Sequence, residues 1–104
     1  MSIQRFKFEK IGSEKLVLPF DFSAGLAVGE TIIAPITASV SIARGKDATP
    51  NAILNGAATI DATSKIVLLP VQGGVVGAEY LFEVVATTSN VKKVLAIKAI
   101  LPII

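Results

Sequence analysis

The carboxylates are the side chains of this chain best suited to acid–base chemistry, because its 104 residues contain neither histidine nor cysteine. Without those two residue types, no Ser/His/Asp or Cys/His nucleophile system can form, and zinc loses its favoured ligands. Glu79 and Glu83 are the most suggestive carboxylate pair. On one strand they would stand roughly 13 Å apart, too far to share a reaction centre. We interpret them as solvated charges on an outer sheet face and expect no enzyme activity.

Two other patterns could hold an ion or a phosphate group. Asp47 and Asp61 are possible calcium ligands, but a calcium loop needs several oxygen ligands at close spacing, which neither residue has nearby. Residues 73–77 form a glycine-rich segment, followed by Ala78-Glu79-Tyr80 instead of the Lys-Ser/Thr and helix of a phosphate-binding loop. We expect a tight loop between strands there. The sequence predicts no catalytic, metal-binding or cofactor-binding residue and no cofactor.

Charge and hydropathy argue against nucleic acid and membrane as partners. The net charge is +2, from ten basic and eight acidic residues. The adjacent basic pair Lys92–Lys93 is followed by no aromatic residue, so it lacks the pattern of a nucleic-acid site. The uncharged stretch 31–43 is interrupted by Pro35 and is too short to span a bilayer. The first ten residues lack the apolar segment of a secretory signal.

Apolar side chains alternate with a period of two along most of the chain, which is typical of strands with one buried face. Glycine, asparagine, aspartate and serine separate these runs, as turns require. The pattern predicts strands near residues 3–9, 15–22, 31–43, 57–61, 64–71, 78–87 and 91–101. We therefore predict one all-β domain over residues 1–104, an immunoglobulin-like antiparallel β-sandwich of about seven strands. The pattern does not separate this topology from another sandwich wiring.

Local details of these strands can be predicted as well. The most secure pairing is a hairpin of 78–87 with 91–101, and Pro50 suits one helical turn within 47–54. Pro19 and Pro35 fall inside predicted strands, although proline cannot donate to a ladder. We expect Pro19 on an edge strand or at a switch between sheets. Pro35 is expected to precede a strand that starts near residue 36.

Tyr80 is the most informative single residue, because it opens a predicted strand after the glycine-rich loop. Immunoglobulin-like sandwiches place a tyrosine corner at this position, with the ring inside and the hydroxyl bonded to the loop backbone. We favour that interpretation over a plain core tyrosine.

The chain contains more apolar residues than a domain of its small size can bury. Hydrophobic residues make up 52% of it and aromatic residues only 6%, so aliphatic side chains must supply the core. Surplus apolar side chains are expected on the outer sheet faces: Val17, Val67, Leu69, Leu81 and Val85. The segments Ile3–Phe6 and Leu101–Ile104 are further docking candidates. Such surface is expected to be covered by another protein.

Several short motifs resemble those of small tailed-bacteriophage virion proteins. The run Phe20–Ile32 is similar to their F-D-[FW]-S-x-x-L-x-x-G-E-T-I segment, and Ala38–Ile42 loosely matches the V-x-V strand that follows it. Gly73–Tyr80 resembles their G-G-x-x-G-x-x-Y segment, and Ala86–Asn90 the A-T-T-S turn. The resemblance covers about residues 16–101.

Two departures from that family leave the position within a virion open. Asn90-Val91-Lys92 stands where Asp-Gly-Arg is common, and residues 4–10 have no counterpart. The shared motif residues look like strand and turn scaffolding, so the resemblance implies no functional site.

The resemblance implies a fibre–tail adaptor or head–tail structural protein, located in the virion. Its partners would be other virion proteins of the tail, fibre, adaptor or capsid, with a homo-oligomer within the particle as a further possibility. A capsid decoration protein is the first alternative. A glycan-binding, adhesin-like module is the second, and the presence of one tyrosine and no tryptophan counts against it.

Overall fold

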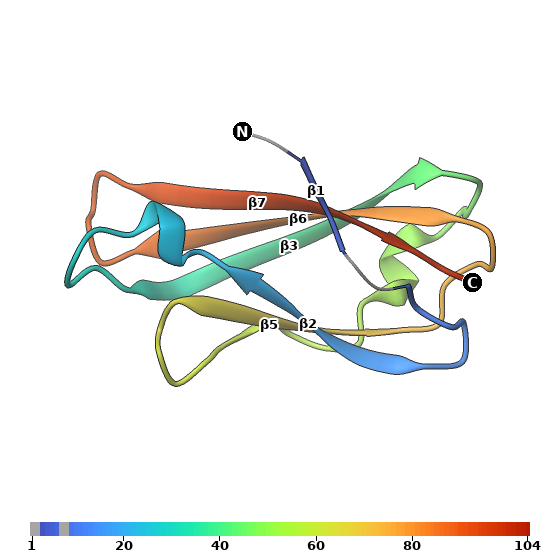
Figure 1. The fold of residues 1–104 in the computed structure, drawn as a ribbon, viewed down its shortest axis with the longest axis horizontal. Helices are drawn as coiled ribbons and strands as arrows, with labels where there is room; N and C mark the ends of the chain where they lie inside the picture. The colour runs from blue at the N-terminus through green and yellow to red at the C-terminus, as the bar shows by residue number, and fades with distance from the viewer. Residues whose placement is uncertain (1–2, 7–8) are drawn as a thin grey trace.

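The computed structural model describes residues 3–6 and 9–104, which form strands joined by loops and two short 3-10 turns (Figure 1). The strands are β1 (Ile3–Arg5), β2 (Lys15–Asp21), β3 (Ile32–Arg44), β4 (Thr59–Ile60), β5 (Ile66–Gln72), β6 (Glu79–Thr88) and β7 (Val94–Pro102). The turns are η1 (Ser23–Gly25) and η2 (Pro50–Ile53). The predicted all-β class is confirmed, and so is the helical turn, with Pro50 at its start.

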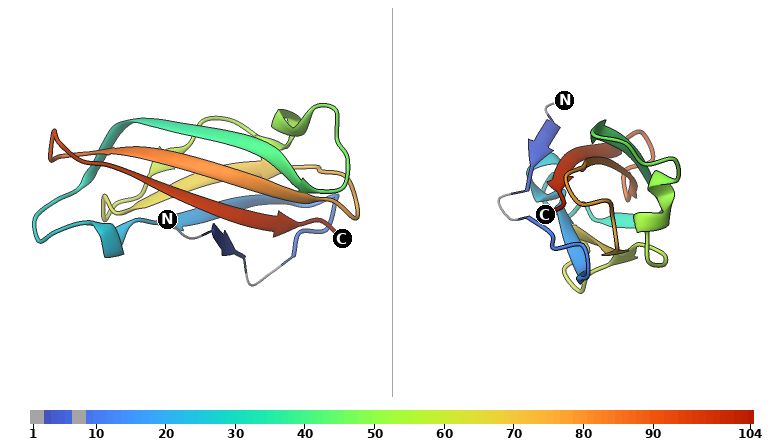
Figure 2. Two further views of the ribbon diagram at one scale, coloured as in Figure 1. Left: turned by 90° about the horizontal axis from the view of Figure 1, so that it is seen from above. Right: turned by 90° about the vertical axis from the view of Figure 1, so that its right-hand side faces the viewer.

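The strands form two layers that face each other across one core (Figures 1 and 2). One sheet has the order β1-β7-β6-β3 and the other the order β2-β5-β4. All pairs are antiparallel except β1 with β7, which is parallel, so the expectation of a wholly antiparallel fold is wrong at this edge. β1 ends at Arg5, and residues 7–8 of the predicted first strand lie outside the described residues.

The centre of the larger sheet is β6, whose residues alternate strictly between the core and the outer face. Tyr80, Phe82 and Val84 are fully buried because β6 has a neighbour on each side and the second sheet beneath. The predicted hairpin with the last strand is confirmed, since β6 pairs with β7 from Glu79 opposite Pro102 to Thr87 opposite Val94. Strand β7 begins later than the predicted residue 91.

The two prolines are accommodated in different ways. Pro19 lies in β2, which is an edge strand, so that prediction is confirmed. Strand β3 already begins at Ile32, and the prediction that it starts near residue 36 is wrong. Its register with β6 shifts between Ile33 and Ile36, which leaves Pro35 out of the ladder. The bulge allows a proline inside a continuous strand without a missing ladder bond.

The outer-face prediction is wrong for two residues of β5. Val67 and Leu69 are 0% and 1% exposed and belong to the core. Apart from Gln72, every residue of β5 is apolar, so alternation cannot reveal which of its faces is buried. The prediction is right for Val17, which is 59% exposed. Leu81 and Val85 lie half-buried on the outer face of β6.

The chain ends are also more tightly packed than expected. Leu101 and Ile103 are buried, so the C-terminal docking prediction is wrong for both, and only Ile104 of that apolar group is exposed. Near the other end, Phe6 is half-buried and meets the ring of Phe20 edge-on, with centroids 5.7 Å apart. Both ends therefore contribute to the folded body.

The molecule is elongated, with extents of 41 × 24 × 23 Å, so its loops gather at two opposite poles (Figure 1). The clamped pole comprises loops 26–31 and 89–93. The lysine pole comprises loops 11–14 and 73–78 together with residues 103–104. Among the described residues, no helix has the length and hydropathy needed to cross a membrane.

Candidate functional site

The lysine pole is organised around Lys10, a lysine whose side chain is wholly removed from solvent. Its ammonium group donates to three backbone carbonyls, those of Ile11 at 3.0 Å, Gly12 at 3.1 Å and Gly73 at 2.6 Å. Burial lowers the pKa of Lys10. Because these carbonyls belong to two loops, the ammonium group ties the loops to each other.

Tyr80 stabilises the same pole from inside the core. Its ring is fully buried, and its hydroxyl oxygen accepts a hydrogen bond from the Val75 backbone N–H at 2.8 Å. The predicted contact between this hydroxyl and the loop backbone is therefore confirmed. The hydroxyl also donates to Asp47 Oδ2 at 2.6 Å. Burial, followed by the bond to Asp47, raises the pKa of Tyr80.

Asp47 has a structural role that the sequence did not reveal. Besides accepting the proton of Tyr80, its carboxylate accepts from the Thr49 backbone N–H at 2.9 Å. The Tyr80 hydroxyl and then this backbone group lower the pKa of Asp47. Asp47 thus joins the loop before η2 to the core, in place of the freely solvated side chain that we expected.

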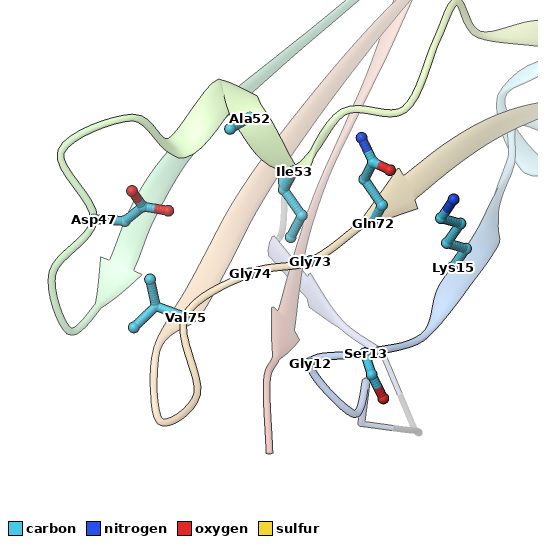
Figure 3. Close-up of a pocket in the computed structure, with 10 residues that line it drawn as sticks. All are labelled: Gly12, Ser13, Lys15, Asp47, Ala52, Ile53, Gln72, Gly73, Gly74 and Val75. Carbon is cyan, nitrogen blue, oxygen red and sulfur yellow. The ribbon is translucent and has the colours of Figure 1, made fainter.

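A shallow hollow of about 470 Å³ lies between these loops and η2 (Figure 3). Its lining residues are Gly12, Ser13, Lys15, Asp47, Ala52, Ile53, Gln72, Gly73, Gly74 and Val75. Lys15 and Gln72 stand together on one side of it, and Asp47 stands on the other (Figure 3). The exposed apolar side chains of this pole are Ile11, Val75, Val76 and Ile104. The hollow is open and its polar groups do not converge, in contrast to the usual binding site for a small ligand.

The clamped pole is held by Glu30, whose carboxylate joins its two loops. Oε1 accepts from the Ala27 backbone N–H at 2.8 Å and from Lys93 Nζ at 2.7 Å, and Oε2 accepts from Asn90 Nδ2 at 3.2 Å. These bonds, led by that from Lys93, lower the pKa of Glu30 to about 2. Lys93 of the basic pair Lys92–Lys93 thus forms an ion pair with Glu30.

Backbone bonds reinforce this clamp. Ser89 N–H donates to the Thr31 carbonyl at 2.9 Å, and Thr31 N–H donates to Ser89 Oγ at 3.0 Å. The two loops nevertheless present valines to solvent, since Val28 and Val91 are 107% and 95% exposed. Holding apolar side chains on well-bonded loops reduces the ordering cost of binding a partner.

The remaining candidate residues from the sequence form no shared site. Glu79 binds Arg5 through two hydrogen bonds of 2.9 and 3.2 Å, and this contact lowers its pKa. Glu83 lies on the same face of β6, opposite Lys98 in the register. Neither glutamate lines the hollow at the lysine pole.

Asp61 belongs to a turn instead of an ion site. It accepts from Thr63 Oγ1 at 2.8 Å and from the Ile66 backbone N–H at 3.3 Å. The contact with Thr63 is the main cause of its lowered pKa. Over residues 3–6 and 9–104, no three His, Cys, Asp or Glu residues form a group that could hold a metal ion. The segment 73–77 is a loop between β5 and β6, as predicted.

Sequence reasoning missed the exposed loop valines, because it looked for surplus apolar surface on the strands. Val28 lies in the sequence Ala-Val-Gly-Glu and Val91 in Asn-Val-Lys-Lys. An isolated apolar residue between turn-forming and charged residues is the signal that could have identified them. A side chain in such a place has no sheet face to enter.

Searches of family models, curated proteins and solved structures returned no match to this chain.

Proposed function

We propose that the chain is a non-enzymatic structural subunit of a bacteriophage virion, placed in the tail, the fibre-to-tail adaptor or the head–tail junction. It acts by packing its poles against other virion proteins. The observation that carries the packing argument is the near-complete exposure of Val28 and Val91 on loops that Glu30 holds together. The motif resemblance over residues 16–101 supports the assignment to a virion.

The strand order supports an immunoglobulin-like topology for this subunit. Counting β2 to β7 as strands B to G, the sheets contain C, F and G on one side and B, E and D on the other. That division is the one found in immunoglobulin-like sandwiches. The bond between Val75 N–H and the Tyr80 hydroxyl at the start of β6 agrees with a tyrosine corner.

The distribution of exposed apolar residues favours contacts at the ends of the molecule. The lysine pole exposes Ile11, Val76 and Ile104, while the clamped pole exposes Val28 and Val91. A subunit with such a surface at each end can bridge two neighbours. Bridging fits an adaptor or junction protein better than a decoration protein, which needs one attachment surface.

The glycan-binding alternative receives no support from the aromatic side chains. Phe20, Phe22, Tyr80 and Phe82 are buried, and Phe6 is half-buried against Phe20. Within the described part of the chain, no aromatic ring is therefore placed as an exposed stacking platform for a sugar.

The test is to measure the chain in purified particles of the phage or prophage that encodes it. Quantitative mass spectrometry should give its copy number relative to the major capsid protein. We expect a low number, as for a single ring of subunits in each particle. A copy number comparable with that of the capsid protein would favour the decoration alternative. Absence from intact particles would show that the proposal is wrong.

A further inference from the structure

Among the four edge strands that the structure describes, β3 is the one that is both long and uncharged. β1 has three residues and β4 has two, which leaves little length for pairing. β2 has seven residues, but it contains Pro19 and carries Lys15 and Asp21 at its ends. β3 has 13 residues and no charged side chain from 32 to 43. Soluble proteins usually protect such an edge, because its free backbone groups can pair with another strand.

Beyond the bulge at Pro35, β3 has a ladder partner on one side only, and it also contacts η2. Residues 36–42 pair with β6 alone, and no other backbone hydrogen bond joins them to the rest of the described chain. Figure 2 shows β3 as the outer border of its sheet. The inward side chains of Ile36, Ala38 and Ile42 remain half-buried, whereas their partners in β6 are fully buried. At this edge, therefore, the inward apolar side chains are incompletely buried and the backbone groups on one side have no strand partner.

We infer that residues 36–42 pair with the same segment of a second copy, antiparallel about a two-fold axis at Ser39. The four-stranded sheets of the two copies would then continue into each other. In this register Ser39 faces Ser39, and Thr37 faces Ser41. These small hydroxyl side chains are exposed on the outer face, where hydroxyl pairs across strands are favourable.

The same register matches the inner face of the edge. Ala38 faces Val40 and Ile36 faces Ile42, so that apolar side chains meet apolar side chains. The first charge beyond the segment, on Arg44, would fall opposite an alanine instead of another charge. We therefore infer that a second copy binds this edge. It supplies an edge strand with the same alternation of apolar and hydroxyl side chains, and the pairing places no like charges opposite each other.

The size of this contact sets its strength. Seven paired residues extend about 24 Å, so the contact is a narrow strip, smaller than the roughly 800 Å² per partner of a standard stable interface. The pair is accordingly weak in dilute solution and strengthens where copies are held close together. The edge is separate from both poles, so the inference does not depend on the proposed function.

Single cysteines provide the test, because the chain contains none of its own. Ser39→Cys should form a covalent dimer under mild oxidation roughly tenfold faster than Thr37→Cys or Ser41→Cys alone, since only position 39 faces itself. An equimolar mixture of the Thr37→Cys and Ser41→Cys proteins should give a heterodimer at a rate close to that of Ser39→Cys.

Val17→Cys is the matched control, because it places an exposed thiol on the edge strand of the other sheet. All four positions are exposed, and unchanged melting temperatures will verify that the variants fold. Equal dimer rates for all four thiols would overturn the inference, and so would fastest self-linking at position 37 or 41. Substitution of the pole valines should leave these rates unchanged, which keeps this test separate from that of the proposed function.

Discussion

At the scale of single residues, Lys10 shows how a small sandwich can use a buried charge to hold loops. Its ammonium group satisfies three carbonyls from loops 11–14 and 73–78. Charge-assisted hydrogen bonds of this kind are stronger than neutral ones. The lowered pKa of Lys10 records the opposing cost of burial.

Lys10→Met retains most of the aliphatic stem and removes all three donors. We expect the free energy of unfolding to fall by about 2 kcal/mol, because carbonyls that lose a charged donor are left less well satisfied. Chemical denaturation will measure the change. Lys15→Met, at an exposed lysine that lines the neighbouring hollow, is the matched control and should have little effect. Equal stability of the two variants would contradict the role assigned to Lys10.

Tyr80 offers a direct spectroscopic prediction, because it is the only tyrosine and the chain has no tryptophan. Its raised pKa means that near-ultraviolet absorbance should report phenol ionisation above the ordinary value of 10.0. Asp47→Asn removes the neighbouring negative charge and should lower that pKa. Ionisation of the wild type at the ordinary value would show that the hydroxyl is not held as described.

Tyr80→Phe removes the same hydroxyl and leaves Val75 N–H and Asp47 without this partner. We expect a loss of about 1–2 kcal/mol in the free energy of unfolding, measured by denaturation. In a double-mutant cycle with Asp47→Asn, the two effects should not add, because both changes disturb one hydrogen bond. Additive effects would argue against coupling between the side chains.

At the scale of elements, the Glu30 clamp makes the contact between loops 26–31 and 89–93 depend on pH. The folded state holds the pKa of Glu30 at about 2, below its ordinary value of 4.5. A lowered carboxylate pKa contributes stability that is complete above the unfolded value and is lost as the pH falls through the folded one. The clamp should therefore weaken between about pH 4.5 and pH 2.

Glu30→Gln should reduce the slope of melting temperature against pH within that window, because the glutamine cannot be protonated there. Glu9→Gln, which removes an exposed carboxylate outside the clamp, is the matched control. Thermal melts across the acid range will distinguish the two variants. A Glu30→Gln profile that parallels the wild type would contradict the clamp.

At the scale of the whole molecule, the elongated shape separates the exposed valines of the two poles from the sheet edge of β3. Val28→Ser with Val91→Ser should reduce incorporation into particles roughly thirtyfold, since each valine contributes about 1 kcal/mol of apolar burial. Val17→Ser is the control, an exposed valine away from the poles. Immunoblots of purified particles will measure incorporation. Normal incorporation of the double variant would exclude the clamped pole as a docking site.

The amino-acid sequence alone predicts the strand content and the central hairpin, because alternation reports which side chains of a strand face a core. It also determined the packing of Tyr80 against its loop, since turn residues and an aromatic at a strand start define that local geometry. Without histidine or cysteine, it already excluded the nucleophile systems that require them. These properties depend on residue types and on neighbours close in the chain.

The buried face of β5 can be identified only in the folded chain, because both of its faces carry apolar residues. The parallel pairing of β1, the burial of Lys10 and the Glu30 clamp are likewise contacts between segments remote in sequence. The bulge at Pro35 and the open edge of β3 also depend on which strand becomes its neighbour. Periodicity is a local property, whereas the choice of neighbour is made by the packing of the whole chain.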